Sequence, residues 1–170
     1  MRLFFLILAL LWTSPVWGEN SVPVKITADT MRYTQKNDEV IFAGNVHVIR
    51  EDINLWSETL TVFLEKQKNT DQAKDPLAAQ QGSIKRITAI GNVRIKAEGN
   101  RSGTCGKATY EAASEVLILE DNPVLKEGPN TIQGEIIKLY IKENRSEVIG
   151  GKKRVEAIFM TQDKQPGQIQ

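Results

Sequence analysis

The sequence predicts an all-β protein, an open antiparallel sandwich or roll of repeated strands around an apolar interior groove. Apolar and polar residues alternate over short spans from Val22 onward, turn residues recur about every eight to twelve positions, and no segment has the period of a helix. In addition, Tyr33 to Leu64 aligns without a gap on Tyr110 to Ile141, 77 residues further along the chain. These three observations indicate one fold built from a repeated β unit.

The 77-residue repeat is carried by apolar positions rather than by reactive ones. The matching pairs are Val40/Leu117, Ile41/Ile118, Phe42/Leu119, Val48/Leu125, Leu55/Ile132, Leu60/Ile137, Val62/Leu139 and Leu64/Ile141, and the identities are Tyr33/Tyr110, Ile41/Ile118, Asn45/Asn122 and Glu58/Glu135. A shared apolar pattern with little identity indicates a common packing role. The repeat therefore favours a scaffold that binds, with chance similarity between β segments as the alternative.

The first 18 residues have the composition of an export signal. Arg2 is followed by an apolar run from Leu3 to Trp12, a break at Ser14-Pro15 and a small residue at Gly18. The apolar run is about ten residues long, whereas a membrane-spanning helix needs roughly 20, so cleavage is favoured over a retained anchor. Without Arg2 the formal net charge of +1 falls to zero, which argues against a nucleic-acid-binding protein.

We expect residues 19–160 to form one β domain and residues 161–170 to be a disordered polar tail. The polar stretch Gln67–Gly82 is expected to be a loop inside this domain, because the strand pattern resumes at Ile84.

Bends are expected within the strands. The triplet Gly44-Asn45-Val46 recurs as Gly91-Asn92-Val93 and, in a degenerate form, as Asp121-Asn122-Pro123. Glycine and asparagine tolerate backbone angles that other residues resist, so each triplet predicts a bend or bulge. Because Pro123 has no N–H for a sheet ladder, the third triplet is expected at an edge or a corner.

Alternation along each strand assigns one of its sides to the interior. The predicted lining residues are Val24, Ile26, Phe42, Val46, Val48, Leu55, Leu60, Val62, Val93, Ile95, Leu117, Leu119, Ile132, Leu139 and Ile141. Strands near Val24–Ile26 and Val155–Phe159 are expected to be the two edges that pair with other chains. The edge residues are Val24, Lys25, Ile26, Val155, Glu156, Ala157, Ile158 and Phe159.

Few residues suit catalysis or metal binding. His47 is the only histidine, and alternation between Val46 and Val48 places it on the solvated face. Cys105 is the only cysteine and is expected to be a small core residue, without an intrachain disulfide. We therefore expect no metal, no cofactor and no catalytic residue.

Two alternatives remain for charged residues. Glu58 and Glu135 are related by the repeat and would be the carboxylates of a glycoside-cleaving enzyme, although turn chemistry is favoured for both. The basic clusters are Lys85-Arg86, Arg94 with Lys96, and Lys152-Lys153-Arg154. They are either a solvated face or strand edge, or sites that attract anionic head groups beside the apolar interior.

Four segments resemble the LptA/OstA family of lipopolysaccharide transport proteins. They are Pro23-Val24-Lys25-Ile26, the run Val40 to Val46, the run Ile132 to Tyr140 and Gly151-Lys152-Lys153-Arg154-Val155. The individual motifs are loose, but their order and the export signal agree with the family. The likeness covers most of the chain after the signal.

The resemblance implies a single β-jellyroll, open along a groove, in the periplasm. Such a protein would bind the lipid A acyl chains of lipopolysaccharide, associate head to tail through its edge strands, and connect an inner-membrane complex through LptC to the outer-membrane LptD. It would have no enzyme activity. The alternatives are an LptC-like component, and an assembly scaffold whose strands pair with other chains without carrying lipid.

Overall fold

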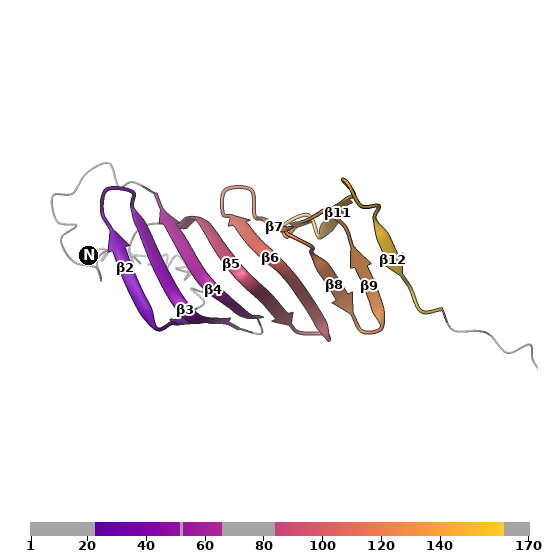
Figure 1. Cartoon of the computed structure of the whole chain (residues 1–170), viewed down its shortest axis with the longest axis horizontal. Helices are drawn as coiled ribbons and strands as arrows, with labels where there is room; N and C mark the ends of the chain where they lie inside the picture. The colour runs from indigo at the N-terminus through magenta and orange to yellow at the C-terminus, as the bar shows by residue number, and fades with distance from the viewer. Residues whose placement is uncertain (1–22, 52, 66–83, 162–170) are drawn as a thin grey trace, which may run out of the picture.

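The computed structural model describes residues 23–51, 53–65 and 84–161, and every regular element in these ranges is a β-strand. The strands are β1 (Val24–Thr27), β2 (Thr30–Thr34), β3 (Glu39–Arg50), β4 (Ile53–Leu64), β5 (Ile84–Ala97), β6 (Arg101–Glu111), β7 (Val116–Glu120), β8 (Val124–Glu127), β9 (Asn130–Gln133), β10 (Ile136–Tyr140), β11 (Arg145–Ile149) and β12 (Glu156–Ile158). They belong to one antiparallel 12-stranded sheet, which stacks along the long axis from β2 to β12 (Figure 1). The predicted signal, the Gln67–Gly82 loop and residues 162–170 of the tail lie outside the described residues.

The all-β prediction is confirmed. The described residues contain no helix of the length and apolar character needed to cross a membrane.

The sheet is folded along one line and is built from eight levels. A level is either one long strand (β3, β4, β5 or β6) or a pair of short strands (β1 with β2, β7 with β8, β9 with β10, or β11 with β12). Each level has one half on either side of the fold line. Half-sheet A consists of β2, residues 39–43 of β3, 59–64 of β4, 84–90 of β5, 107–111 of β6, and then β7, β10 and β11. Half-sheet B consists of β1, residues 46–50, 53–57, 93–97 and 101–105 of the same four long strands, and then β8, β9 and β12. The chain therefore passes between the two halves once at every level.

The predicted bends are the points where the chain crosses between the halves. Register shifts lie between Ala43 and Val46 and between Ile90 and Val93, as the two Gly-Asn-Val triplets predict. Each Gly-Asn pair has positive φ, with 80° and 46° at Gly44 and Asn45 and 85° and 45° at Gly91 and Asn92. Left-handed backbone is least costly for these two residue types, which explains their presence at the corners.

The third triplet also forms a corner. Asp121 and Asn122 have φ of 61° and 58°, and they join β7 in half-sheet A to β8 in half-sheet B. Pro123 is fully buried at this point. Because the strand changes partners here, from residues 107–111 of β6 to residues 101–104, the missing N–H of proline interrupts no ladder.

The 77-residue repeat corresponds to a shift of four levels in the stack. Val40 and Leu117 share one row of Cα partners, Phe42 and Leu119 share a second, and Val48 and Leu125 share a third. Residues that match in the repeat therefore occupy equivalent places. Physical equivalence of this kind accounts for a conserved apolar pattern with little sequence identity.

Candidate functional site

The inner side of the folded sheet is lined by three rows of residues that run across all eight levels. On half-sheet A the rows are Met31–Phe42–Leu60–Ala89–Ala108–Leu119–Ile137–Val148 and Tyr33–Val40–Val62–Ile87–Tyr110–Leu117–Leu139–Ser146. On half-sheet B the row is Ile26–Val48–Leu55–Ile95–Gly103–Leu125–Ile132–Ala157. Continuous rows arise because side chains alternate between the two faces and the register is kept from strand to strand.

Burial of the inner side chains decreases from the corners outward. Beside the corners the side chains are fully buried, including Val46 and Leu60 at 1% exposed and Leu119 and Ile137 at 0%. Farther from the corners the apolar side chains that pack against this core are only half-buried, among them Val40, Leu55, Ile87, Ile95, Leu117, Leu125 and Leu139. The interior is thus a packed seam along the corners, flanked by apolar surface that is still partly accessible.

Most predicted lining residues lie in this interior. Val46, Leu60, Val62, Val93 and Leu119 are buried in the core, and Ile26, Phe42, Val48, Leu55, Ile95, Leu117 and Leu139 pack against it. Ile132 lies half-buried on the row of half-sheet B. Lipid binding by these residues stays a prediction.

Val24 and Ile141 lie outside the packed interior. Val24 is 47% exposed on the edge strand β1, and Ile141 is 55% exposed just beyond the end of β10. The repeat holds least well at Ile141, because its counterpart Leu64 is paired with Ile84 and half-buried. Lipid contact at Val24 and Ile141 also stays a prediction.

Ala89, Ala108 and Ile137 are buried core residues that the predicted lining did not include. Ala89 and Ala108 are 2% and 3% exposed at the centre of the core, yet alanine gives little periodic signal. Ile137 has a clear signal, since it is the repeat counterpart of the predicted residue Leu60. Small side chains where the corner is tightest let the two half-sheets approach each other.

Carboxylates occupy the corners, each lying over a glycine of the neighbouring level. A Cβ atom on Gly44 would overlap Asp29, one on Gly91 would overlap Glu58, one on Gly106 would overlap Asp121, and one on Gly151 would overlap Glu135. Two of these carboxylates also accept a side-chain amide: Asn45 Nδ2 lies 2.9 Å from Asp29 Oδ2 and Asn92 Nδ2 lies 2.5 Å from Glu58 Oε1. Glu135 Oε2 accepts the backbone N–H of Lys152 at 2.7 Å.

This arrangement accounts for the repeat-related pair Glu58 and Glu135 without catalysis. Both side chains hold a bend by bonding to the next level. Glu58 lies on β4 and Glu135 between β9 and β10, four levels apart, which corresponds to about 19 Å at the usual strand spacing. A glycosidase needs its two carboxylates within about 10 Å, so these two cannot act as one pair in a single chain.

The contacts of His47 and Cys105 indicate packing roles rather than catalysis. His47 is on the outer face of half-sheet B, where its ring stacks on Trp56 with centroids 4.8 Å apart and Nε2 lies 3.1 Å from Asn54 Oδ1. Cys105 is 8% exposed in the core, and burial raises the pKa of its thiol to about 11. A thiol held protonated in this way is a poor nucleophile. In the described part of the chain no cluster of potential metal ligands is found.

Both ends of the stack expose edge strands. β1 pairs only with β3 and β12 only with β9, so the two predicted edges are edges of half-sheet B. The sequence analysis missed the other half of each edge, which is β2 at one end and β11 at the other. Several apolar side chains are exposed at these ends, including Met31 at 56%, Ile158 at 50% and Phe159 at 64%. Pairing through these edges stays a prediction.

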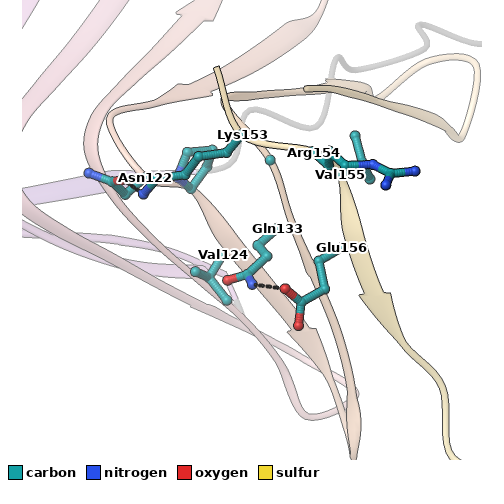
Figure 2. Close-up of a pocket in the computed structure, with 9 residues that line it drawn as sticks. Asn122, Val124, Gln133, Lys153, Arg154, Val155 and Glu156 are labelled. Carbon is teal, nitrogen blue, oxygen red and sulfur yellow. Dashed lines mark hydrogen bonds between the residues drawn. The ribbon is translucent and has the colours of Figure 1, made fainter. Parts of the chain in front are cut away.

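A cavity of about 640 Å³ with a mixed polar and apolar lining lies at the end of the stack that contains β12. It is lined by Asn122, Pro123, Val124, Gln133, Gly134, Lys153, Arg154, Val155 and Glu156 (Figure 2). Lys153 Nζ bonds to Asn122 Oδ1 at 3.1 Å, and Gln133 Nε2 bonds to Glu156 Oε2 at 2.9 Å. Val124, Gln133 and Glu156 lie on the outer row of half-sheet B, so these three lining residues face away from the apolar interior.

Comparison with known proteins identifies the architecture. Residues 25–145 match the family described as LptA/(LptD N-terminal domain) LPS transport protein. The chain belongs to this family. It is 24% identical over 156 residues to the lipopolysaccharide export system protein LptA of Escherichia coli K12 and to that of Shigella flexneri, covering 91% of this chain and 77% of each relative.

The fold also matches a solved structure. LptH of Pseudomonas aeruginosa, described as the LptA-homologous periplasmic component of the lipopolysaccharide transport device, superimposes with a TM-score of 0.66. The match covers 82% of this chain and 96% of LptH at 15% sequence identity. The open antiparallel fold is thereby confirmed, and the family match over residues 25–145 confirms the predicted family.

Proposed function

We propose that this chain is a periplasmic lipopolysaccharide-binding bridge protein, which carries lipopolysaccharide from the inner to the outer membrane along a continuous hydrophobic groove. The observation that carries the proposal is the set of half-buried apolar rows beside the packed seam. Lipid A acyl chains would lie on these rows, between the free ends of the two half-sheets. Membership of a lipopolysaccharide transport family supports this choice of lipid.

The energy of such binding is adequate without any polar contact. Burial of one methylene group stabilises a complex by about 0.8 kcal/mol, so ten buried methylenes contribute about 8 kcal/mol before the cost of association. The rows cross eight levels, which corresponds to about 34 Å at the usual strand spacing. Since successive levels present similar side chains, a lipid would move between sites of similar free energy, with the direction set by energy supplied elsewhere.

End-to-end stacking would extend the rows from one copy to the next. The edge at β1 and β2 and the edge at β11 and β12 each present unpaired backbone groups, and the exposed apolar side chains Met31, Ile158 and Phe159 lie beside them. A neighbouring copy would cover both features. The same edges would join the chain to LptC at the inner membrane and to LptD at the outer membrane.

The chain would act without catalysis. Removal of residues 1–18 would release it into the periplasm, and the corner carboxylates are engaged in holding bends. We therefore expect the double variant Glu58→Gln/Glu135→Gln to support lipopolysaccharide export in cells that lack the natural protein. Loss of export by a double variant that is folded and present at normal levels would favour the enzyme alternative.

Mass spectrometry of co-purifying lipid tests the proposal. Lipopolysaccharide should accompany the chain purified from a Gram-negative periplasm, and Leu139→Asp should remove it by placing a charge on a half-buried interior row. Ile118→Asp is the matched control, because Ile118 is also half-buried but faces outward from β7. Wild-type protein that oligomerises but never carries lipid would instead support the assembly scaffold.

A further inference from the structure

The outer faces of the two half-sheets differ in how their charges are neutralised. On half-sheet A the outer rows hold five basic residues, Arg32, Arg86, Lys107, Lys138 and Arg145, and four acidic ones, Glu39, Glu111, Glu120 and Glu147. The salt bridges found among the described residues all involve this half: Arg86–Glu111 at 2.5 Å, Lys107–Glu120 at 2.8 Å and Arg145–Glu143 at 3.0 Å.

The outer face of half-sheet B is basic and unpaired. Its two rows are Thr27–His47–Trp56–Arg94–Thr104–Val124–Gln133–Glu156 and Lys25–Ile49–Asn54–Lys96–Ser102–Lys126–Thr131–Ile158. Within these two rows of paired residues there are four cations, Lys25, Arg94, Lys96 and Lys126, and one carboxylate, Glu156, which lies at the far end of the stack. All four are exposed, and no salt bridge involves them in the described part of the chain.

An aromatic stack lies among these cations. The His47 ring is parallel to Trp56 within 10°, and the Arg94 guanidinium lies 5.7 Å from the centre of the Trp56 ring. The stack fixes an indole ring at the surface beside the apolar side chain of Ile49, while Val124 lies on the same face three levels away. Indole rings surrounded by cations are typical of surfaces that contact the interface of a lipid bilayer.

We propose that the outer face of half-sheet B docks on an anionic lipid bilayer. Lys25 lies on β1 and Lys126 on β8, five levels apart, so the cations span about 24 Å. One small anion cannot contact charges spread so widely, whereas a bilayer that contains phosphatidylglycerol presents negative charge over the whole distance. Because this face is opposite the apolar interior, the chain would rest on a membrane while its interior stays free for the lipid in transit.

The structure also separates two of the three basic clusters of the sequence, because they lie on different half-sheets. Arg86 lies on half-sheet A, where a salt bridge to Glu111 neutralises its charge. Arg94 and Lys96 point away from the apolar interior, so they do not lie beside it as the head-group interpretation required. They are instead at the centre of the face that we assign to the bilayer.

Vesicle flotation with residues 19–170, which contain every strand of the structure, tests the inference. Vesicles with about one third phosphatidylglycerol should bind the chain at low salt and release it at about 0.5 M salt, and pure phosphatidylcholine vesicles should not bind it. Each cation near an anionic surface contributes roughly a fivefold factor, so Arg94→Gln/Lys96→Gln should weaken binding about 25-fold. The control Arg32→Gln/Lys138→Gln makes the same change of charge on half-sheet A and should alter binding less than about twofold.

Trp56 reports which face is in contact, because it is the only tryptophan of residues 19–170. Brominated phosphatidylglycerol should quench its fluorescence in the wild-type chain. Absence of binding, binding without quenching, or equal losses in the two double variants would each overturn the inference. Leu139→Asp should bind vesicles normally, so failure of lipid transport and failure of membrane docking are distinguishable.

Discussion

Two neighbouring residues on β10 provide a sharp test of the graded interior. Ile137 and Leu139 point to the same side, but Ile137 is 0% exposed in the packed seam while Leu139 is half-buried on the adjacent row. Truncation of a fully buried isoleucine removes its transfer free energy and leaves a cavity, so Ile137→Ala should cost about 4 kcal/mol in the free energy of unfolding. Leu139→Ala leaves no closed cavity, and its cost should be about 1 to 2 kcal/mol.

Urea unfolding followed by circular dichroism measures both costs. With a slope of about 2 kcal/mol per molar urea, the midpoint should fall by about 2 M for Ile137→Ala and by less than about 1 M for Leu139→Ala. The order should reverse in lipid binding, where Leu139 matters and Ile137 is inaccessible. Equal losses of stability, or a larger loss for Leu139→Ala, would refute the division into a packed seam and an accessible row.

Three further predictions concern the corners, the thiol and the edge. Gly91→Ala places a Cβ against the Glu58 carboxylate at positive φ and should lower the stability by about 3 kcal/mol in thermal unfolding. The control Gly128→Ala, at φ of 55° with nothing within 4 Å of its Cβ, should lose only about 1 kcal/mol. Equal losses would contradict a structural role for the contact between Glu58 and Gly91. Burial raises the pKa of the Cys105 thiol to about 11, above its ordinary value of 9.0. At pH 8 the native thiol should therefore react with Ellman's reagent only as fast as the chain unfolds. Rapid reaction of the folded protein would contradict this prediction. Deletion of residues 155–170 removes β12 and should abolish oligomers in size-exclusion chromatography while circular dichroism still reports a folded sheet; oligomers of unchanged size would disprove this edge assignment.

Much of the fold followed from local patterns in the sequence. Alternation predicted strands and the inward-facing residues of β3, β4 and β10, because alternation is a property of each strand by itself and the apolar side of a strand is the side that packs inward. The Gly-Asn pairs predicted bends at the right residues, since their backbone angles are a local property. Even the four-level shift was present in the 77-residue repeat.

Long-range features did not follow in the same way. Nothing local indicates that Asp29, Glu58, Asp121 and Glu135 share one line of corners, because that depends on pairing between levels. The pattern also could not separate Ile137 in the packed seam from Leu139 on the accessible row, because both are apolar and face inward. The second edge strands, β2 and β11, were missed because each is the continuation of an edge across a corner. The unpaired state of Arg94 and Lys96 depends likewise on which half-sheet they occupy.

Site-specific photocrosslinking on β7 tests the proposed lipid path most directly. Leu117 and Ile118 are adjacent and both half-buried, but Leu117 packs against the apolar core inside and Ile118 faces outward between Thr109 and Lys138. A photoreactive residue at Leu117 should capture lipopolysaccharide in cells, while one at Ile118 should capture none. Equal capture at the two positions, or capture only at Ile118, would contradict transport along the interior.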